Sequence, residues 1–492
     1  MRTRPLVIPV VLAVLQWGCT DLLTEEPKSV ITTENFFRSA ADAEAAIAAA
    51  YQPLSSGDVW DTALQWGLNA ASDDARVGPE EENNNIIALT QLRWDARNPY
   101  VAGSTSSTGP WAGLYRIITR ANLILERVPA IEMETTQKDQ VLAQAKFLRA
   151  LSYFYLVRLY GDVPVVTTTE EQFAFGERTP KADVYARIIQ DATEAETVLP
   201  SSWDAAQKGR ATQGSANALL AELYLWRSSA EGMNEWQQAA DAAKKIIDSG
   251  VYALLPNYID AFLPRSETRS EEVFAAQASN ATGAPSLAIA YWTYPRALDP
   301  NGNGGWGTYQ PLPWFIESYP AGDYRREVSF FTSGKTPDGR DTTFLPHIYK
   351  FRPTDRPGPF DDNWPIYRYA DVLLMYAEAL NELGQPDQAI QYVNQVRARA
   401  RNGTGAEGRA QPADLTAMSQ AATRDAIFQE RHWELAFEGK RWFDMVRRGA
   451  DYFLAAEARD PTATDPQPTD MLWPIPQAQI DLNPQLAQNP GY

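Results

Sequence analysis

Aromatic side chains gather in one short segment of the sequence, residues 291–319. Eight of these 29 residues are aromatic, more than twice the 11% share of the whole chain. A sugar presents apolar C–H faces ringed by hydroxyls, so flat rings on a Gly/Asn-rich loop such as Asp299–Gly305 suit glycan capture. Alternatively, the rings pack beneath the loops or against a protein partner. The predicted ligand-binding residues of this segment are Trp292, Tyr294, Trp306, Tyr309 and Trp314.

Three carboxylates, Glu430, Glu434 and Glu438, recur every four residues and would share one face of a helix. Such a row could serve acid–base chemistry or hold a metal ion. However, arginines lie three residues from these acids, so we interpret the row as a structural ion network. The residues expected to join it are Arg431, Arg441, Asp444, Arg447 and Arg448, with Arg397, Arg399 and Arg401 from the preceding helix. His432 is interpreted as a packed or capped histidine.

No catalytic motif stands out in the chain. It lacks a Gly-x-Ser-x-Gly, His-Glu-x-x-His or phosphate-loop sequence, and two histidines and one cysteine leave little for a metal centre. A glycoside hydrolase needs two carboxylates placed across a sugar, but nothing among 62 acidic residues marks such a pair. The formal charge of −18 argues against binding nucleic acid. We therefore predict a binding protein that is not an enzyme and needs no cofactor.

Helical periodicity covers most of the chain. Ser39 and Asp42 form a capping-box pattern that opens the first helix. Residues 55–110 are rich in Gly, Asn, Asp and Ser and are predicted to be loop. Residues 251–365 are predicted to form long loops with short strands, and the tail from Leu472 to be extended. The other predicted helices span residues 111–128, 141–160, 181–198, 213–228, 235–248, 366–383, 387–400 and 423–448.

Two of the predicted helix pairs show a repeat pattern. In residues 366–400, small residues such as Ala377 and Ala389 would let antiparallel helices approach closely, and Gly384 permits a tight turn. This pattern resembles a tetratricopeptide unit. The pair in residues 213–248 looks similar, with a longer turn. Several such pairs predict a mostly α fold with a helical-repeat layer, an α–α superhelix.

The N-terminus has the features of a bacterial export signal. Two arginines precede ten apolar residues, Leu6–Leu15, which are too few to span a bilayer of about 30 Å but fit a secretory signal. Gly18 and Cys19 then resemble a lipobox, although Gln16 stands where leucine is usual. We expect Cys19 to become the N-terminal residue and to carry acyl chains such as palmitate. The alternative is an incidental or buried cysteine.

Short sequence motifs along nearly the whole chain resemble those of the SusD/RagB family. The longest motif is Glu430–Met445, ERHWELAFEGKRWFDM. The order and spacing of the motifs make the resemblance specific, but they do not cover the predicted ligand loops. The other motifs are Asn35–Phe37, Asp42–Ile47, Arg120–Asn122, Ala145–Ala150, Tyr160–Pro164, Gly209–Thr212, Arg368–Ala379, Asn394–Ala400, Pro474–Pro476 and Asn489–Tyr492.

The resemblance implies a surface-exposed, lipid-anchored, nutrient-binding protein of the outer membrane. It implies tetratricopeptide-like helix pairs on one side, with an irregular, loop-rich ligand-binding face and a few short strands on the other. It also implies a partner, a SusC-like TonB-dependent barrel that receives captured glycans or, in some members, peptides. The expected organisation is a signal peptide (1–18), a lipidated tether (19–32), an N-terminal helical region (33–250), a ligand-binding insertion (251–365) and a C-terminal helical region (366–492), together one compact unit.

Family members often place ligand contacts in the loop after the first helices, and residues 64–95 carry suitable side chains. The ligand-binding residues implied there are Trp66, Asn69, Asp73, Asp74, Arg76 and Trp94. The acidic doublet could instead bind Ca²⁺ or cap a turn. Two other function classes stay open, a helical-repeat scaffold for protein assembly and a lipid-anchored hydrolase. The aromatic segment favours ligand capture over a role in protein assembly alone. The identity of the ligand depends on the geometry of the loops.

Overall fold

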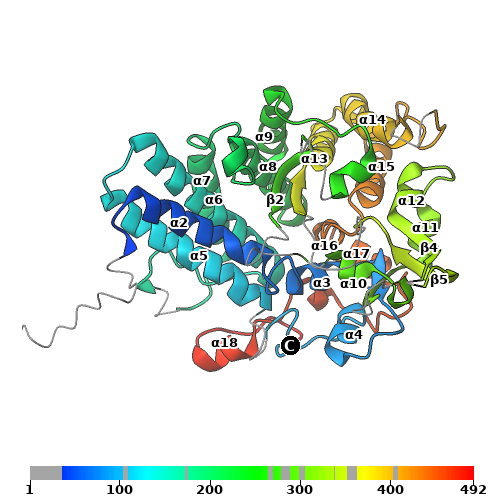
Figure 1. Cartoon of the computed structure of the whole chain (residues 1–492), viewed down its shortest axis with the longest axis horizontal. Coiled ribbons are helices and arrows are strands. Elements are labelled where there is room, and N and C mark those ends of the chain that lie inside the picture. The colour runs from blue at the N-terminus through cyan, green and yellow to red at the C-terminus, as the bar shows by residue number, and fades with distance from the viewer. Residues whose placement is uncertain are drawn as a thin grey trace, which may run out of the picture.

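Helices form most of the chain, and their pairs build one extended layer (Figure 1). The computed structural model describes residues 36–103, 109–171, 176–263, 270–278, 287, 289–298, 305–336, 338–351, 363–402 and 408–492. The mostly α prediction is confirmed. The signal peptide, Cys19 and the tether lie outside the described residues. Within the described part, no helix combines the length and the apolar character needed to cross a bilayer.

Successive helices of the layer pack against each other. α5 packs on α6, α6 on α7, α8 on α9, and α13 on α14, while α9 also contacts α13 and joins the pairs. Both predicted repeat pairs are confirmed, and the turn between α13 and α14 uses Gly384 with a φ of +78°. The bounds are α5 (Gly109–Arg127), α6 (Thr135–Tyr160), α7 (Lys181–Glu196), α8 (Gln213–Ala230), α9 (Trp236–Ser249), α13 (Tyr369–Glu382) and α14 (Pro386–Asn402).

The helix α6 is central to the core. From Phe147 to Tyr160 every residue is buried, because α2 (Ala40–Tyr51), α5, α7 and α8 all contact this helix. A helix that is apolar on all sides is stable only when it is covered on all sides. Ser39 and Asp42 form the predicted capping box at the start of α2.

In the described part of the chain, three two-stranded antiparallel sheets position the loop-rich region. β1 (Ala75–Val77) pairs with β3 (Tyr309–Pro311), and β2 (Glu272–Ala276) pairs with β6 (Trp364–Arg368). β4 (Phe330–Lys335) and β5 (Asp341–Ile348) form a hairpin. The first two sheets tie residues 251–365 to both helical regions. This region also contains short helices that were not predicted, α10 (Ile289–Thr293), α11 (Pro313–Ser318) and α12 (Tyr324–Ser329).

The prediction of a loop at residues 55–110 is wrong in part, because α3 (Ala63–Ala70) and α4 (Asn84–Thr90) lie there. Every residue of α3 is buried, so its backbone groups need the hydrogen bonds of a helix. Gly67 lies within this helix because of its packing. A Cβ at this position would lie 2.4 Å from the Trp473 ring.

The predicted helix 423–448 is two helices, α15 (Gln420–Glu434) and α16 (Arg441–Arg447). Between them the chain turns through Phe437 and Gly439, whose φ angles are +64° and +69°. Such left-handed angles interrupt a helix. α17 (Ala450–Glu457) and the short α18 (Gln477–Leu482) follow, so the tail is not wholly extended.

Candidate ligand-binding site

Trp306 is the most exposed aromatic side chain among the described residues, with 41% of its surface accessible. Its ring meets Trp292 edge to face, with centroids 5.3 Å apart. Trp292 in turn meets the buried Trp66 at 4.9 Å, and Trp66 packs on Tyr309 at 6.0 Å. Trp306 is therefore the outermost member of an aromatic stack that reaches into the core. We name Trp306, Trp292 and Trp66 the tryptophan stack.

Main-chain hydrogen bonds hold the outer part of the tryptophan stack in place. The amide of Gly307 donates to the carbonyl of Tyr294 at 2.9 Å, and the amide of Thr308 donates to the carbonyl of Trp292 at 2.8 Å. Gly305 approaches so closely that an added Cβ would lie 2.4 Å from the Tyr294 carbonyl oxygen. β1 and β3 then fix the following residues, so the ring of Trp306 is carried by a well-supported backbone.

Polar and aromatic side chains surround the tryptophan stack. The Arg296 Nε donates to the Trp306 carbonyl at 3.3 Å, and its side chain is exposed. Tyr100 packs on Trp66 at 4.9 Å and accepts from the Asn83 amide through its hydroxyl at 3.4 Å. Tyr294 is half-buried and packs on Phe331 at 5.7 Å. Neither Arg296 nor Tyr100 was predicted as a site residue, although both flank predicted aromatic residues in the sequence.

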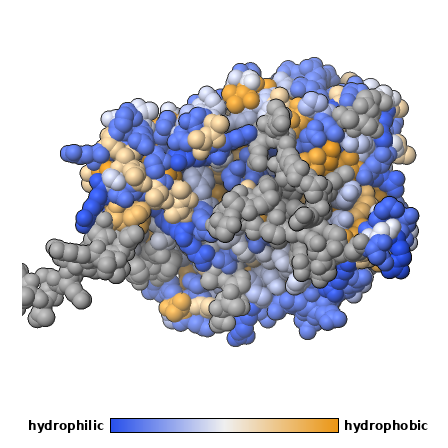
Figure 2. Space-filling model, in the orientation of Figure 1, coloured by the Kyte–Doolittle hydropathy of each residue, from blue (hydrophilic) through white to orange (hydrophobic). Residues whose placement is uncertain are grey.

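Hydrophobic residues on the face shown in Figure 2 form separate patches among hydrophilic ones. The large hydrophobic side chains that are exposed in the described part of the chain are Val198, Met233, Val251, Trp306, Leu345 and Leu482. Trp306 is the aromatic member of this set. A single exposed ring over a rigid base provides a stacking surface for the apolar face of a sugar.

Two aromatic residues of the predicted segment pack against other side chains. Tyr309 is 1% exposed, since it packs beneath Trp66. Trp314 is half-buried, with the Arg459 guanidinium 4.6 Å from its ring centroid and His432 packed at 5.8 Å. These two rings pack beneath the loops, which is the alternative that the sequence left open. Trp292 and Tyr294 keep partial exposure.

The two tryptophans of the early segment are also core residues in this structure. Trp66 is 2% exposed on α3, and Trp94 is 4% exposed. The Trp94 Nε1 donates to the Tyr492 hydroxyl at 2.7 Å, and its ring packs on Trp442 and Trp473. The early segment therefore supports the site from below, through Trp66, and anchors the C-terminus through Trp94.

Asp73 is completely buried and belongs to an ion pair. Its carboxylate accepts from Arg441 at 2.5 and 2.8 Å and from Arg459 at 3.0 Å. Burial alone would raise the pKa of Asp73, but the Arg441 guanidinium, His432 and Arg459 together lower it to about 2. Asp73 is thus a permanent anion that neutralises cations of the core, and it cannot contact a ligand in this conformation.

Asp74 and Asn69 bond the turn between α15 and α16. Asp74 accepts from the Phe437 amide at 3.3 Å and from the Ser72 hydroxyl. Asn69 accepts from the Gly439 amide at 3.1 Å. Burial is the main cause that raises the pKa of Asp74 to about 6. Both side chains are buried and serve the fold.

The acidic doublet does not fit a calcium site. Calcium takes six to eight oxygen ligands, whereas Asp73 is bonded by guanidinium groups and Asp74 is bonded by a hydroxyl and an amide. Among the described residues, no group of three or more His, Cys, Asp or Glu side chains could hold a metal ion. Arg76 lies half-buried on β1 opposite Gln310, beside the site.

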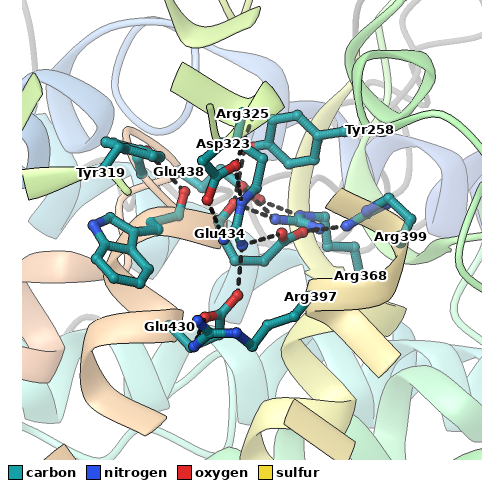
Figure 3. Close-up of polar contacts among 12 residues, drawn as sticks. Tyr258, Tyr319, Asp323, Arg325, Arg368, Arg397, Arg399, Glu430, Glu434 and Glu438 are labelled. Atoms are coloured by element: carbon teal, nitrogen blue, oxygen red, sulfur yellow. Dashed lines mark hydrogen bonds and ion pairs between the residues drawn. The ribbon is translucent and has the colours of Figure 1, made fainter. Parts of the chain in front are cut away.

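The predicted ion network exists, but most of its partners were not those expected (Figure 3). Glu430 pairs with Arg325 at 2.7 Å and with Arg397 at 3.2 Å. Glu434 pairs with Arg368 at 2.6 Å and with Arg325 at 3.1 Å, and also with Arg399. The expected contributions of Arg397 and Arg399 are confirmed. Arg325 and Arg368 come from outside the two predicted helices.

The turn after α15 explains the other differences. Glu438 lies beyond the helix, so the three glutamates do not share one helix face, and it pairs with Arg368 and Lys350, each at 2.7 Å. Arg431 pairs with Asp371 and Asp444, not with Glu434. The remaining pairs are Arg441 with Asp73, Arg447 with Asp444 and Glu378, Arg448 with Asp425, and Arg401 with Asp414. His432 is buried and stacks on Phe315 at 4.3 Å, as a packed histidine.

This network fixes the loop-rich region to the C-terminal helices. Arg325 lies in the short helix α12 and pairs with Glu430 and Glu434 of α15. Lys350 follows β5 and donates to Glu438 and to the carbonyls of Glu434 and Ala436. Burial lowers the pKa of Lys350 to about 8. Buried charges without partners are costly, so these pairs specify one arrangement of the loops. The segments that carry Arg325 and Lys350 are therefore held firmly against the C-terminal helices.

Comparison with known proteins identifies the family. Residues 332–492 match the SusD family, and residues 21–225 match a family described as "Starch-binding associating with outer membrane". The chain is 30% identical to SusD-like protein P2 of Formosa agariphila over 522 residues, which cover 98% of each chain. The chain belongs to the SusD/RagB family.

Solved structures agree with this assignment. A SusD superfamily protein from Parabacteroides distasonis is 27% identical and superposes with a TM-score of 0.80, covering 94% of this chain and all of that one. A structure described as a laminarin binding SusD-like protein is also 27% identical, with a TM-score of 0.76 and coverage of 92% and 100%. The fold described above is thus the fold of that family.

Proposed function

We propose that this protein is a surface lipoprotein of the outer membrane that captures oligosaccharides. In this proposal Trp306, supported by Trp292, stacks on a sugar ring, and Tyr294 and Arg296 flank the ligand. The protein catalyses no reaction and passes the ligand to a SusC-like TonB-dependent barrel. Peptide capture is the second ligand class.

The observation that carries this proposal is the exposed ring of Trp306 over a rigid aromatic base. Exposing the apolar ring of a tryptophan to water is unfavourable for folding. A ring that a fixed backbone holds at the surface is therefore typical of a ligand-binding position. Two similarities support glycan as the ligand: the match to a family described as "Starch-binding associating with outer membrane" and the likeness to a solved structure described as a laminarin binding SusD-like protein. The family description also supports association with the outer membrane.

Affinity electrophoresis of the purified protein tests the site. We expect gels that contain starch or laminarin to retard the wild type. The Trp306→Ala variant should bind roughly two- to tenfold more weakly and be retarded less, since contact with one aromatic ring contributes on the order of 0.5–1.5 kcal/mol. Met233→Ala is the matched control, because Met233 is 43% exposed in the turn after α8. Retardation that Trp306→Ala leaves intact would contradict the site.

Each alternative function has a distinct outcome in this experiment. Release of reducing sugar during incubation would identify a hydrolase. Binding of an oligopeptide mixture, but of no polysaccharide, would identify a peptide receptor. A protein that binds neither ligand would act only in protein assembly.

The anchor and the transporter require cellular experiments. We expect Cys19→Ala to move the protein from the outer-membrane fraction to the soluble fraction, because acyl chains would no longer hold it. Membrane retention of this variant would contradict lipidation. Purification of the tagged protein from mild detergent should co-purify a TonB-dependent barrel, and a preparation without one would contradict the proposed partner.

A further inference from the structure

A groove lies between residues 201–212 and the strand β2. It encloses about 340 Å³, and its walls include Trp203, Tyr252 and Phe274. It shares no lining residue with the tryptophan stack. Its volume lies within the range of about 300–1,000 Å³ that is typical of small-ligand sites.

The aromatic wall of this groove is fixed in position. The Trp203 Nε1 donates to the Ala211 carbonyl at 2.8 Å, and the Arg210 guanidinium lies 5.6 Å from the ring centroid. The Tyr252 hydroxyl bonds the Thr212 hydroxyl at 2.7 Å. Gly214 leaves room for Tyr252, since an added Cβ would lie 2.5 Å from its ring. Trp203 remains half-buried, so part of its ring is accessible.

The polar lining of the groove is balanced in charge. The lining contains two acids, Asp204 and Glu272, and two bases, Lys208 and Arg210, with hydroxyl groups from Ser201, Ser202 and Thr212. Arg210 is further neutralised by Glu44 at 2.8 Å. An aromatic wall beside hydroxyl, carboxylate and ammonium groups matches the apolar face and hydroxyl rim of an uncharged sugar.

The groove is poorly suited to a peptide that adds as a strand. Such a peptide would need the free backbone groups of β2. The Val273 carbonyl already accepts from the Ser215 hydroxyl at 2.9 Å, and the Ala275 carbonyl accepts from the Gln277 amide at 3.2 Å. Side chains therefore already bond two backbone carbonyls that an added strand would need. A ligand of this groove would be recognised by the side chains of its walls instead.

From this geometry we infer that the groove between residues 201–212 and β2 is a second carbohydrate-binding site, which takes an uncharged sugar unit against Trp203. This inference rests on the proposed function, since both sites would bind the same class of glycan. A second contact on one polysaccharide raises the overall affinity when both can be engaged at once.

Fluorine NMR of protein labelled with 5-fluorotryptophan tests each site separately. The chain has 15 tryptophans, and Trp203→Phe and Trp306→Phe assign the two resonances of interest. On titration with laminarihexaose and, separately, maltohexaose, we expect both resonances to shift saturably with at least one sugar. Trp203 then reports this inference, and Trp306 reports the proposed function.

A variant that blocks the groove shows whether the Trp203 resonance shifts because the sugar binds in the groove or because binding elsewhere changes the structure. Ser202→Leu fills the exposed edge of the groove and should abolish the Trp203 shift while the Trp306 shift persists. Ser333→Leu makes the same change on the exposed strand β4 and should leave the Trp203 shift intact, and a melting curve of each variant confirms folding.

The outcomes separate the inference from the proposed function. A Trp306 shift without a Trp203 shift, or a Trp203 shift that survives Ser202→Leu, would overturn the second site alone. If neither resonance shifts with either sugar, the inference and the proposed glycan site both fail. A Trp203 shift alone would support this groove and overturn the stack as a site.

Discussion

Arg441 closes a two-point ion pair on Asp73, with N–O distances of 2.5 and 2.8 Å, across 368 residues of sequence. Both side chains are buried, and the pair joins the segment after α3 to the start of α16. The ion pair thereby ties the segment before β1 to the C-terminal region. Because β1 pairs with β3, the strand that follows Trp306 in the sequence is held as well. Removal of either partner would leave a buried charge unpaired.

We expect Asp73→Asn to lower the free energy of unfolding by about 3–5 kcal/mol, the usual cost of breaking a buried ion pair. Urea denaturation at pH 7 measures this change. Asp414→Asn is the control, since Asp414 pairs with Arg401 but is 57% exposed, and it should cost less than about 1 kcal/mol. A loss below 1 kcal/mol in the Asp73 variant would contradict the structural role of the pair.

Asp74 predicts a distinct pH dependence. Its pKa is about 6 in the folded protein and 3.8 in the unfolded chain, so the folded state holds the proton more tightly between these values. The contribution of this group to stability is therefore present below pH 4 and is lost as the pH rises through 6.

We expect Asp74→Asn to remove this loss, because an amide has no ionisable proton. Its oxygen can accept from the Phe437 amide, and its NH2 group can donate to the Ser72 hydroxyl oxygen, with the direction of that bond reversed. At pH 7.5 the variant should be as stable as the wild type or more stable, by up to about 3 kcal/mol, and the two should converge near pH 4. Melting temperatures of both proteins between pH 4 and 8 check this. A variant that matches the wild type near pH 4 but is less stable than it at pH 7.5 would show that Asp74 is needed in its ionised form.

Substitutions within the tryptophan stack should separate binding from stability. Trp66→Ala should lower the free energy of unfolding by about 3–5 kcal/mol, as is usual for a buried large aromatic residue. Trp306→Ala should change it by no more than about 0.5 kcal/mol, because its ring is at the surface. Denaturant titrations of the two variants give the comparison. Equal losses would mean that Trp306 is a core residue rather than a binding surface.

Gly305 predicts a backbone effect on the site. We expect Gly305→Ala to displace Trp306, since the new Cβ would meet the Tyr294 carbonyl oxygen at 2.4 Å and neither backbone can yield easily. The displacement should appear as a shifted Trp306 fluorine resonance without ligand. Gly176→Ala is the control, because nothing lies within 4 Å of its added Cβ. An unchanged resonance in the Gly305 variant would show that the loop adapts.

The helical part of the fold was predictable because its signals are local. Small residues in 366–400 and Gly384 determine how α13 meets α14, and the capping residues Ser39 and Asp42 bond within one turn of α2. The break after Glu434 was not predicted, because Phe437 adopts a left-handed φ that its residue type does not favour.

The site was predictable only in part, because burial depends on contacts between distant segments. Trp306 and Tyr309 lie in the same aromatic segment, yet one is exposed and the other is buried under Trp66. Likewise, an acidic doublet looks the same in sequence whether it meets a ligand or an arginine. The residue that decides this for Asp73 is Arg441, and no local pattern connects the two.

Main-chain hydrogen bonds of the neighbouring residues hold position 306 in place. The amide of Gly307 donates to the carbonyl of Tyr294, and the amide of Thr308 donates to the carbonyl of Trp292. The fold therefore places few demands on the identity of side chain 306 itself. This position is a natural point for engineering, where tyrosine, histidine or arginine could be installed to retune selectivity without redesign of the scaffold. On the proposed function, single substitutions at position 306 would change which ligand is bound while the supporting backbone stays the same.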